Sequence, residues 1–136
     1  MADDLTLTGC TIEFRTHDDN KDHDTILDVA VKNKVNLFLS QDIATGKNLG
    51  GDQEFPDPST KDFNLTLASN NIKMSDLTEP FTNIHITPNG HDRWIFDFTV
   101  SLIFADAAGG NKTFSSTTNG VILDQDNRDF NGVFGS

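Results

Sequence analysis

The feature that most constrains the fold of this chain is an alternation of apolar and polar residues with a period of two. The alternation is clearest between Phe96 and Phe104, where apolar side chains are separated by Asp97, Thr99 and Ser101. Successive side chains of a β-strand point to opposite faces of the sheet, so this pattern predicts strands with one buried face. Further apolar sets of this kind are Ile12 and Phe14; Leu27, Val29 and Val31; Val35, Leu37 and Leu39; Phe63, Leu65 and Leu67; Ile84 and Ile86; and Phe114, Val121 and Leu123.

The segments between these sets have the composition of turns. Gly, Asn, Asp and Pro gather at Gly50–Asp52, Phe55–Pro58, Pro88–Gly90 and Gly109–Asn111. Seven or eight short strands separated by such turns predict an all-β fold, an eight-stranded antiparallel β-sandwich or jelly roll. The length of 136 residues fits one domain, so we expect residues 1–136 to form a single β-sandwich.

Two segments depart from the alternation. Ile72–Leu77 could form a helical turn, with Ser75 as its cap. The stretch from Gln41 to Lys61 is the longest irregular one. Long loops without secondary structure are uncommon in compact domains, so we expect this stretch either to be functional or to contain an edge strand.

The acidic segment Asp18–Asp24 carries the strongest functional signal. It holds four aspartates and one asparagine in seven residues, between two predicted strands. Adjacent carboxylates repel one another, and Ca²⁺ relieves this repulsion by binding six to eight oxygen ligands. We therefore predict a calcium site with Asp18, Asp19, Asn20, Asp22 and Asp24 as ligands. The alternative is a solvated loop that only keeps an acidic protein soluble, because Asp and Asn are common in turns.

The acidic segment does not match an EF-hand. In a loop starting at Asp18, the sixth position requires glycine and the twelfth requires a bidentate glutamate. His23 and Val29 occupy these positions, and the flanking segments predict strands instead of helices. A calcium site here would therefore belong to a β-sandwich loop.

A second oxygen-rich segment, Thr87–Asp92, links the predicted strand at Ile84–Ile86 to the long strand that begins near Trp94. Loops of a sandwich gather at its two ends. If this segment and Asp18–Asp24 share one end, Asn89 and Asp92 would complete the coordination sphere.

Several function classes are disfavoured. The formal net charge of −11 argues against nucleic-acid binding and against unaided binding to anionic membranes. His17 directly precedes the acidic segment and His23 lies within it, but the chain has no H-E-x-x-H motif and no cysteine pair that would support zinc. The chain has no G-x-S-x-G elbow or phosphate loop, and we predict that it is not an enzyme. The single cysteine, Cys10, cannot form an intrachain disulfide.

In order along the chain, the acidic loop, the strands at Phe63–Leu67 and Ile84–Ile86, and the segment Gly90–Trp94 resemble the PLAT domain. This lipoxygenase-homology domain is similar to C2 domains, and a His–Asp pair shortly before a Trp is common in it. The resemblance implies an eight-stranded sandwich that binds calcium at one end and serves as a non-catalytic partner of lipids, membranes or proteins. The family's glycine-rich turn near the first acidic residue is absent here.

Two other functions stay open. One is a calcium-dependent carbohydrate-binding, lectin-like module, and the other is a structural or assembly protein. The chain has eleven phenylalanines, no tyrosine and one tryptophan, Trp94, and their alternating positions predict core packing more than sugar platforms. No stretch of about 18 apolar residues predicts a transmembrane helix. The N-terminus lacks the apolar region of a secretory signal, although a processed extracellular protein stays open.

Overall fold

The computed structural model describes residues 5–16, 25–36, 39–51, 59–87, 93–106 and 108–134. These ranges form nine strands and one short 3₁₀ helix: β1 (Thr6–Thr16), β2 (Ile26–Asn36), β3 (Leu39–Gly46), β4 (Ser59–Asn64), β5 (Thr66–Leu67), η1 (Met74–Asp76), β6 (Pro80–Thr87), β7 (Arg93–Ala105), β8 (Asn111–Asp124) and β9 (Asp129–Val133). Within these ranges, no helix is long and apolar enough to cross a membrane.

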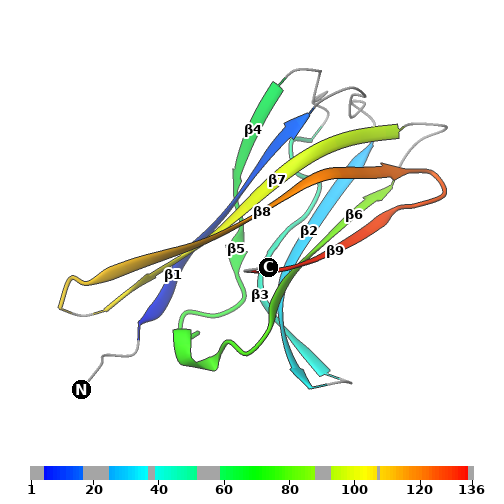
Figure 1. Ribbon diagram of the computed structural model, residues 1–136. Coiled ribbons are helices and arrows are strands. Elements are labelled where there is room, and N and C mark those ends of the chain that lie inside the picture. Colours follow the sequence, from blue (N-terminus) through cyan, green and yellow to red (C-terminus); the bar gives the residue numbers. More distant parts are fainter. Residues whose placement is uncertain are drawn as a thin grey trace.

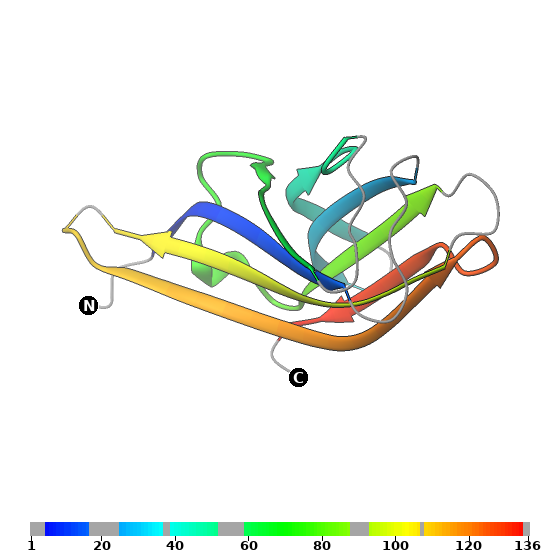
Figure 2. The same cartoon turned by 90° about the horizontal axis from the view of Figure 1, so that it is seen from above.

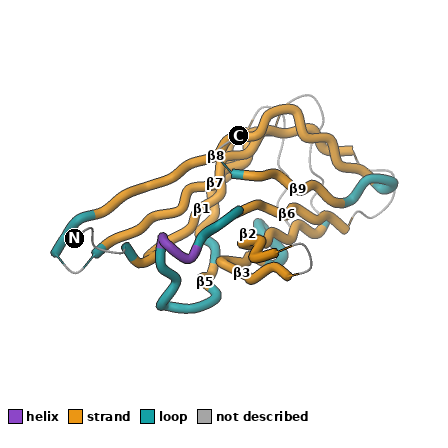
Figure 3. Tube along the Cα trace, turned by 60° about the horizontal axis from the view of Figure 1, so that its bottom comes forward, coloured by secondary structure: helices purple, strands orange, loops and turns teal. Residues whose placement is uncertain are grey.

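The strands form two antiparallel sheets that lie face to face (Figures 1 and 2). The first has the order β4-β1-β7-β8, and the second has the order β5-β3-β2-β6-β9. Figure 3 shows the single helical turn, η1, in the connection between β5 and β6. The predicted β-sandwich is therefore confirmed, with nine strands in place of the expected eight.

The core lies between the sheets and is filled by the inward face of each strand. In β7, every second residue from Trp94 to Phe104 is buried, which confirms the strand predicted from the alternation. Trp94 stacks on Phe96 with ring centroids 3.8 Å apart, and Phe14 of β1 lies 5.3 Å from the Trp94 ring. This aromatic cluster lies near the end of β1 and the start of β7 in the chain.

The predicted strand through Val35, Leu37 and Leu39 is wrong. Val35 ends up in β2 and Leu39 in β3, and their side chains are 43% and 52% exposed. Asn36 pairs with Leu39, so the chain reverses direction here. The alternation continues from the exposed end of β2 into the exposed start of β3, and apolar spacing alone does not distinguish two paired strands from one.

The predicted strand through Phe63, Leu65 and Leu67 is divided between the two sheets. Phe63 belongs to β4 in the first sheet, and Leu67 belongs to β5 in the second. Leu65 lies between them and is buried, and its N–H donates to the carbonyl of Cys10 at 2.8 Å. Only Leu65 separates β4 from β5, so the apolar residues keep their spacing of two while the chain passes from one sheet to the other.

Three smaller expectations have mixed outcomes. The stretch Gln41–Lys61 does contain strand structure, because β3 continues to Gly46 and β4 begins at Ser59. The helical turn at Ile72–Leu77 exists as η1, but Lys73 instead of Ser75 occupies the N-cap position, and the Asp76 carboxylate accepts from the Lys73 N–H at 3.1 Å. The pattern did not predict β9, because its exposed positions, including Val133, mask the alternation of a half-buried edge strand.

Candidate metal-binding end of the sandwich

The seven predicted calcium ligands lie outside the described residues. These are Asp18, Asp19, Asn20, Asp22, Asp24, Asn89 and Asp92. What the structure does describe is the framework of strands that leads into and out of the two segments carrying them. We call the end of the sandwich at which β1 and β6 terminate and β2 and β7 begin the loop end.

The strands that flank both oxygen-rich segments terminate together at the loop end (Figure 1). In the second sheet, Ile26 at the start of β2 lies opposite Thr87 at the end of β6. In the first sheet, Thr16 at the end of β1 lies opposite Phe96 of β7. The strands on either side of each segment therefore belong to different sheets, and all four have their termini at the same end. In the sequence analysis, a site shared by both segments required that they lie at the same end, which the sequence alone could not show.

A third connection and a turn belong to the same end. Thr16 also lies opposite Ser59, so the chain enters β4 there after the segment 52–58. Arg93 at the start of β7 lies opposite Asp124, where β8 turns towards β9. The loop end therefore gathers several connections that are rich in Asp and Asn in the sequence.

One buried hydrogen bond joins the strands next to the two oxygen-rich segments. The indole Nε1–H of Trp94 donates to Oγ1 of Thr16 at 2.9 Å, and both side chains are at most 3% exposed. Thr16 directly precedes the first segment, and Trp94 comes two residues after the second. This burial confirms that Trp94 packs in the core and does not form an exposed sugar platform.

Acidic side chains in the described parts of the loop end hold backbone groups. Asp28 accepts from the N–H of Asn48 at 2.9 Å, and Asp97 accepts from that of Gly120 at 2.8 Å. Asp124 accepts from the N–H groups of Asp126 and Asn127, both at 2.9 Å. These carboxylates stabilise turns in the way that Asp commonly does. The Asp124 bonds are local to one turn, whereas those of Asp28 and Asp97 join residues 20 and 23 positions apart, and the sequence did not reveal them.

The described residues contain no cluster of three or more His, Cys, Asp or Glu side chains arranged to hold a metal ion. His85, predicted to face solvent from its strand, is partly exposed and lies 2.8 Å from Asp129 of β9. His17, His23 and His91 lie outside the described ranges. The predicted calcium ligands all belong to the segments 17–24 and 88–92, which lie outside the described residues.

Cys10 is part of the buried core of the folded protein. Its side chain is buried in β1, and burial raises the pKa of the thiol from 9.0 to about 12. With this raised pKa, almost no thiolate, which is the reactive form of cysteine, is present near neutral pH. Cys10 therefore behaves as a small apolar residue of a buried strand.

We expect Ellman's reagent at pH 8 to label Cys10 slowly in the folded protein and quickly after unfolding in urea. The folded thiol is both inaccessible and protonated, whereas unfolding returns its pKa to the ordinary range. The absorbance of the thiolate that the reagent releases measures the rate of labelling. Rapid stoichiometric labelling of the folded protein would contradict this burial.

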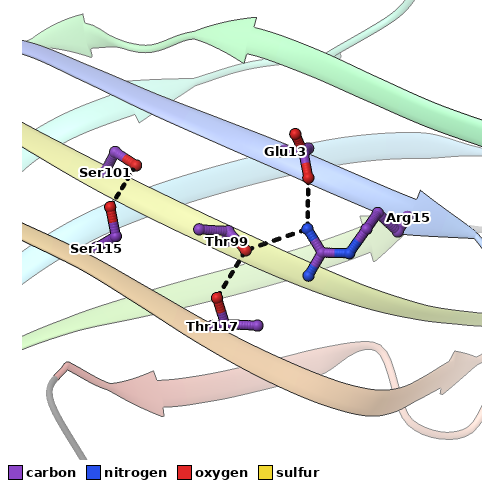
Figure 4. A network of polar contacts seen from close by, with 6 residues as sticks. All are labelled: Glu13, Arg15, Thr99, Ser101, Ser115 and Thr117. Atoms are coloured by element: carbon purple, nitrogen blue, oxygen red, sulfur yellow. Dashed lines mark hydrogen bonds and ion pairs between the residues drawn. The ribbon is translucent and has the colours of Figure 1, made fainter.

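The outer face of the first sheet carries an ordered polar network (Figure 4). Arg15 forms an ion pair with Glu13 and donates to Oγ1 of Thr99 at 3.2 Å. Thr99 in turn lies 2.8 Å from the hydroxyl of Thr117, and Ser101 bonds Ser115 at 2.9 Å. Beside this network, β4, β1 and β7 form an open depression of about 430 Å³, lined by Thr11, Ile12, Glu13, Asp62, Phe63, Asn64, Thr99 and Ser101.

Comparisons with known proteins found no matching family model, no similar curated protein and no similar solved structure. The resemblance to the PLAT domain therefore stays a prediction from the sequence.

Proposed function

We propose that this chain is a non-catalytic β-sandwich module that binds Ca²⁺ at its loop end and uses that end to contact a lipid surface or a protein. The observation that carries the proposal is that the strands flanking the two oxygen-rich segments have their termini at the same end of the sandwich. Ile26 lies opposite Thr87, and the Thr16–Trp94 hydrogen bond joins the strands on the other sheet. Ligands supplied by two loops need such a shared and rigid base, because calcium takes six to eight oxygens.

Charge supports calcium over a solvated loop. The protein has 21 acidic and 10 basic residues, and the segments 17–24 and 88–92 contribute five aspartates to this excess. A bound divalent cation can be the largest local charge of its site. Calcium would lower the repulsion among these carboxylates and could bridge them to an anionic lipid headgroup, which the net charge of −11 would otherwise repel.

We expect Ca²⁺ to raise the melting temperature and EDTA to lower it. A ligand that binds only the folded state at a hundredfold excess over its Kd stabilises that state by about 2.7 kcal/mol. For a chain of this size, this corresponds to a shift of roughly 10 °C. Scanning calorimetry with 1 mM CaCl₂ (roughly a hundredfold excess for a Kd near 10 μM) or with EDTA measures the shift.

Two variants and one control locate the site. Asp22→Ala and Asp24→Ala should remove the shift if these carboxylates bind the ion. Asp42→Ala removes the same charge from β3, where Asp42 forms an exposed ion pair with Lys32, and it should leave the shift unchanged. A melting curve of the unaltered protein that ignores both Ca²⁺ and EDTA would contradict the calcium proposal.

The partner is tested separately from the ion. Sedimentation with phosphatidylserine vesicles in Ca²⁺, but not in EDTA, would support a lipid partner. Calcium binding without sedimentation would instead favour a protein partner or a structural role, in which the ion only stiffens the loops.

A carbohydrate-binding module is the second candidate, and the polar depression on the first sheet favours it. Carboxylate, amide and hydroxyl groups of Glu13, Asp62, Asn64 and Thr99 line the depression, and such groups bond sugar hydroxyls. The network of Figure 4 holds Glu13 and Thr99 in place before any ligand arrives. Binding on a glycan array that is lost in Asp62→Ala would favour this candidate over the lipid module.

A further inference from the structure

The edge of β8 differs from the other three sheet edges of the sandwich. The edge strands β4, β5 and β9 span six, two and five residues, whereas β8 spans fourteen. Proteins normally keep edge strands short or charged, because an exposed edge offers unpaired N–H and C=O groups to another strand. Among the described strands, only β7 pairs with β8. Figure 1 shows β8 next to β7, at the edge of the first sheet.

The regular part of this edge runs from Asn111 to Thr118. In these residues the pairing with β7 is continuous, and five consecutive side chains from Asn111 to Ser115 are exposed. Beyond Thr118 the register shifts, and Gly120 adopts a positive φ of 72°. Asn127 also donates to the carbonyl of Ile122 at 3.0 Å. The bulge and this bond end the stretch that a new strand could join.

Charge is also nearly absent from the regular edge. Asn111–Thr118 contains no acidic residue and one charged residue, Lys112, although the chain as a whole carries a net charge of −11. By contrast, β4 carries Asp62 and Lys61, and β9 begins at Asp129. Two copies of so acidic a protein repel each other least where acidic side chains are missing.

We propose that two copies of this chain pair antiparallel through Asn111–Thr118 of β8, which joins their first sheets into one continuous sheet. A twofold axis at Ser115 places each Lys112 opposite Thr118 of the second copy. At 3.4 Å per residue, the two lysines then lie roughly 20 Å apart along the strands, beyond the Debye length of about 8 Å at physiological ionic strength. Such an isologous pairing closes on itself and forms a dimer instead of a fibre.

An exposed aromatic ring next to the axis adds apolar area to this pairing. Phe114 is 39% exposed and borders a depression of about 250 Å³ whose lining includes Met74, Leu77 and Phe134. In the proposed register Phe114 lies opposite Ser116 of the second copy. The new strand would cover part of its ring, and burial of apolar area favours association.

Sedimentation velocity of the full chain from 1 to 500 μM (roughly the range of Kd for modest interfaces) tests the pairing. We expect a dimer whose Kd rises roughly tenfold or more in Ser115→Glu and also in Ser115→Lys, because each change places like charges opposite each other at the axis. The two changes alter the net charge in opposite directions, so general repulsion cannot explain a shared loss of the dimer.

Two controls separate pairing from damage to the sheet. Ser115→Ala removes the bond to Ser101 without adding charge, and it should keep the dimer. Thr60→Glu adds a charge to β4, the opposite edge of the same sheet, and it should also keep the dimer. A monomer at every concentration would overturn the proposal. A dimer that tolerates both charged changes at Ser115 would overturn it as well.

Discussion

Replacing Trp94 with alanine should lower the free energy of unfolding by about 3–5 kcal/mol, the largest loss expected from a single change in this protein. The indole is 1% exposed, stacks on Phe96 and packs against Phe14. Its removal leaves a cavity that neighbouring strands cannot close, and it also leaves the hydroxyl of Thr16 without its indole donor. Urea unfolding followed by far-ultraviolet circular dichroism measures the loss.

A double-mutant cycle separates the hydrogen bond from the cavity. Trp94→Phe keeps most of the ring, and Thr16→Val keeps the shape of the threonine, so each removes the bond but leaves one buried polar group behind. Each single change should cost about 1–3 kcal/mol. The double variant should cost less than their sum, because neither polar group then remains without its partner. If the two losses of free energy simply added, the hydrogen bond between Thr16 and Trp94 would contribute nothing to stability.

The sequence predicted the strands that have one fully buried face. In β7, the inward residues from Trp94 to Phe104 meet both neighbouring strands and the opposite sheet, so each needs an apolar side chain. Peripheral strands carry less of this requirement. In β9 the residues are only partly buried at alternate positions, and Asn131 bonds Asn83 on the outer face. A pattern based on burial therefore predicts central strands better than edges.

The sequence could not show where one sheet ends and the other begins. Around Leu65 the alternation of apolar residues continues while the chain leaves β4 and enters β5. The same spacing serves both sheets because their inner faces point into one core. Pairing partners, not composition, decide the assignment, and partners such as Ala44 for Leu67 are distant in the sequence.

The candidate site shows the same division between local and long-range information. Local composition was enough to single out Asp18–Asp24 and Asn89–Asp92 as oxygen-rich. The common end of their flanking strands depends on the pairing of Ile26 with Thr87, which are 61 positions apart in the numbering. Likewise, the hydrogen-bond partner of Trp94 is Thr16, which is 78 residues away in the sequence. Neither contact leaves a signal in a local window.

The second large effect is expected at Asn33, a buried polar residue on the inward side of β2. Its Oδ1 accepts from the N–H groups of Thr78 and Glu79 at 2.9 and 3.0 Å, and its Nδ2 donates to the carbonyl of Asp76 at 3.0 Å. One side chain thus satisfies three backbone groups in the connection that leads from η1 into β6. Polar satisfaction of this kind explains why an asparagine follows Leu27, Val29 and Val31 on the buried face.

Asn33→Ala should lower the free energy of unfolding by about 1–3 kcal/mol, because three part-buried backbone hydrogen bonds lose their side-chain partner. Asn33→Leu fills the space again, so an equal loss in that variant would assign the effect to the hydrogen bonds and not to a cavity. Asn83→Ala on the neighbouring strand β6 is the matched control. It removes one exposed bond, to Asn131 at 3.1 Å, and should cost less than about 0.5 kcal/mol. If Asn33→Leu proved as stable as the unaltered protein, the connection before β6 would not depend on Asn33, and its position would instead follow from the packing of Leu77 and Met74 against the core.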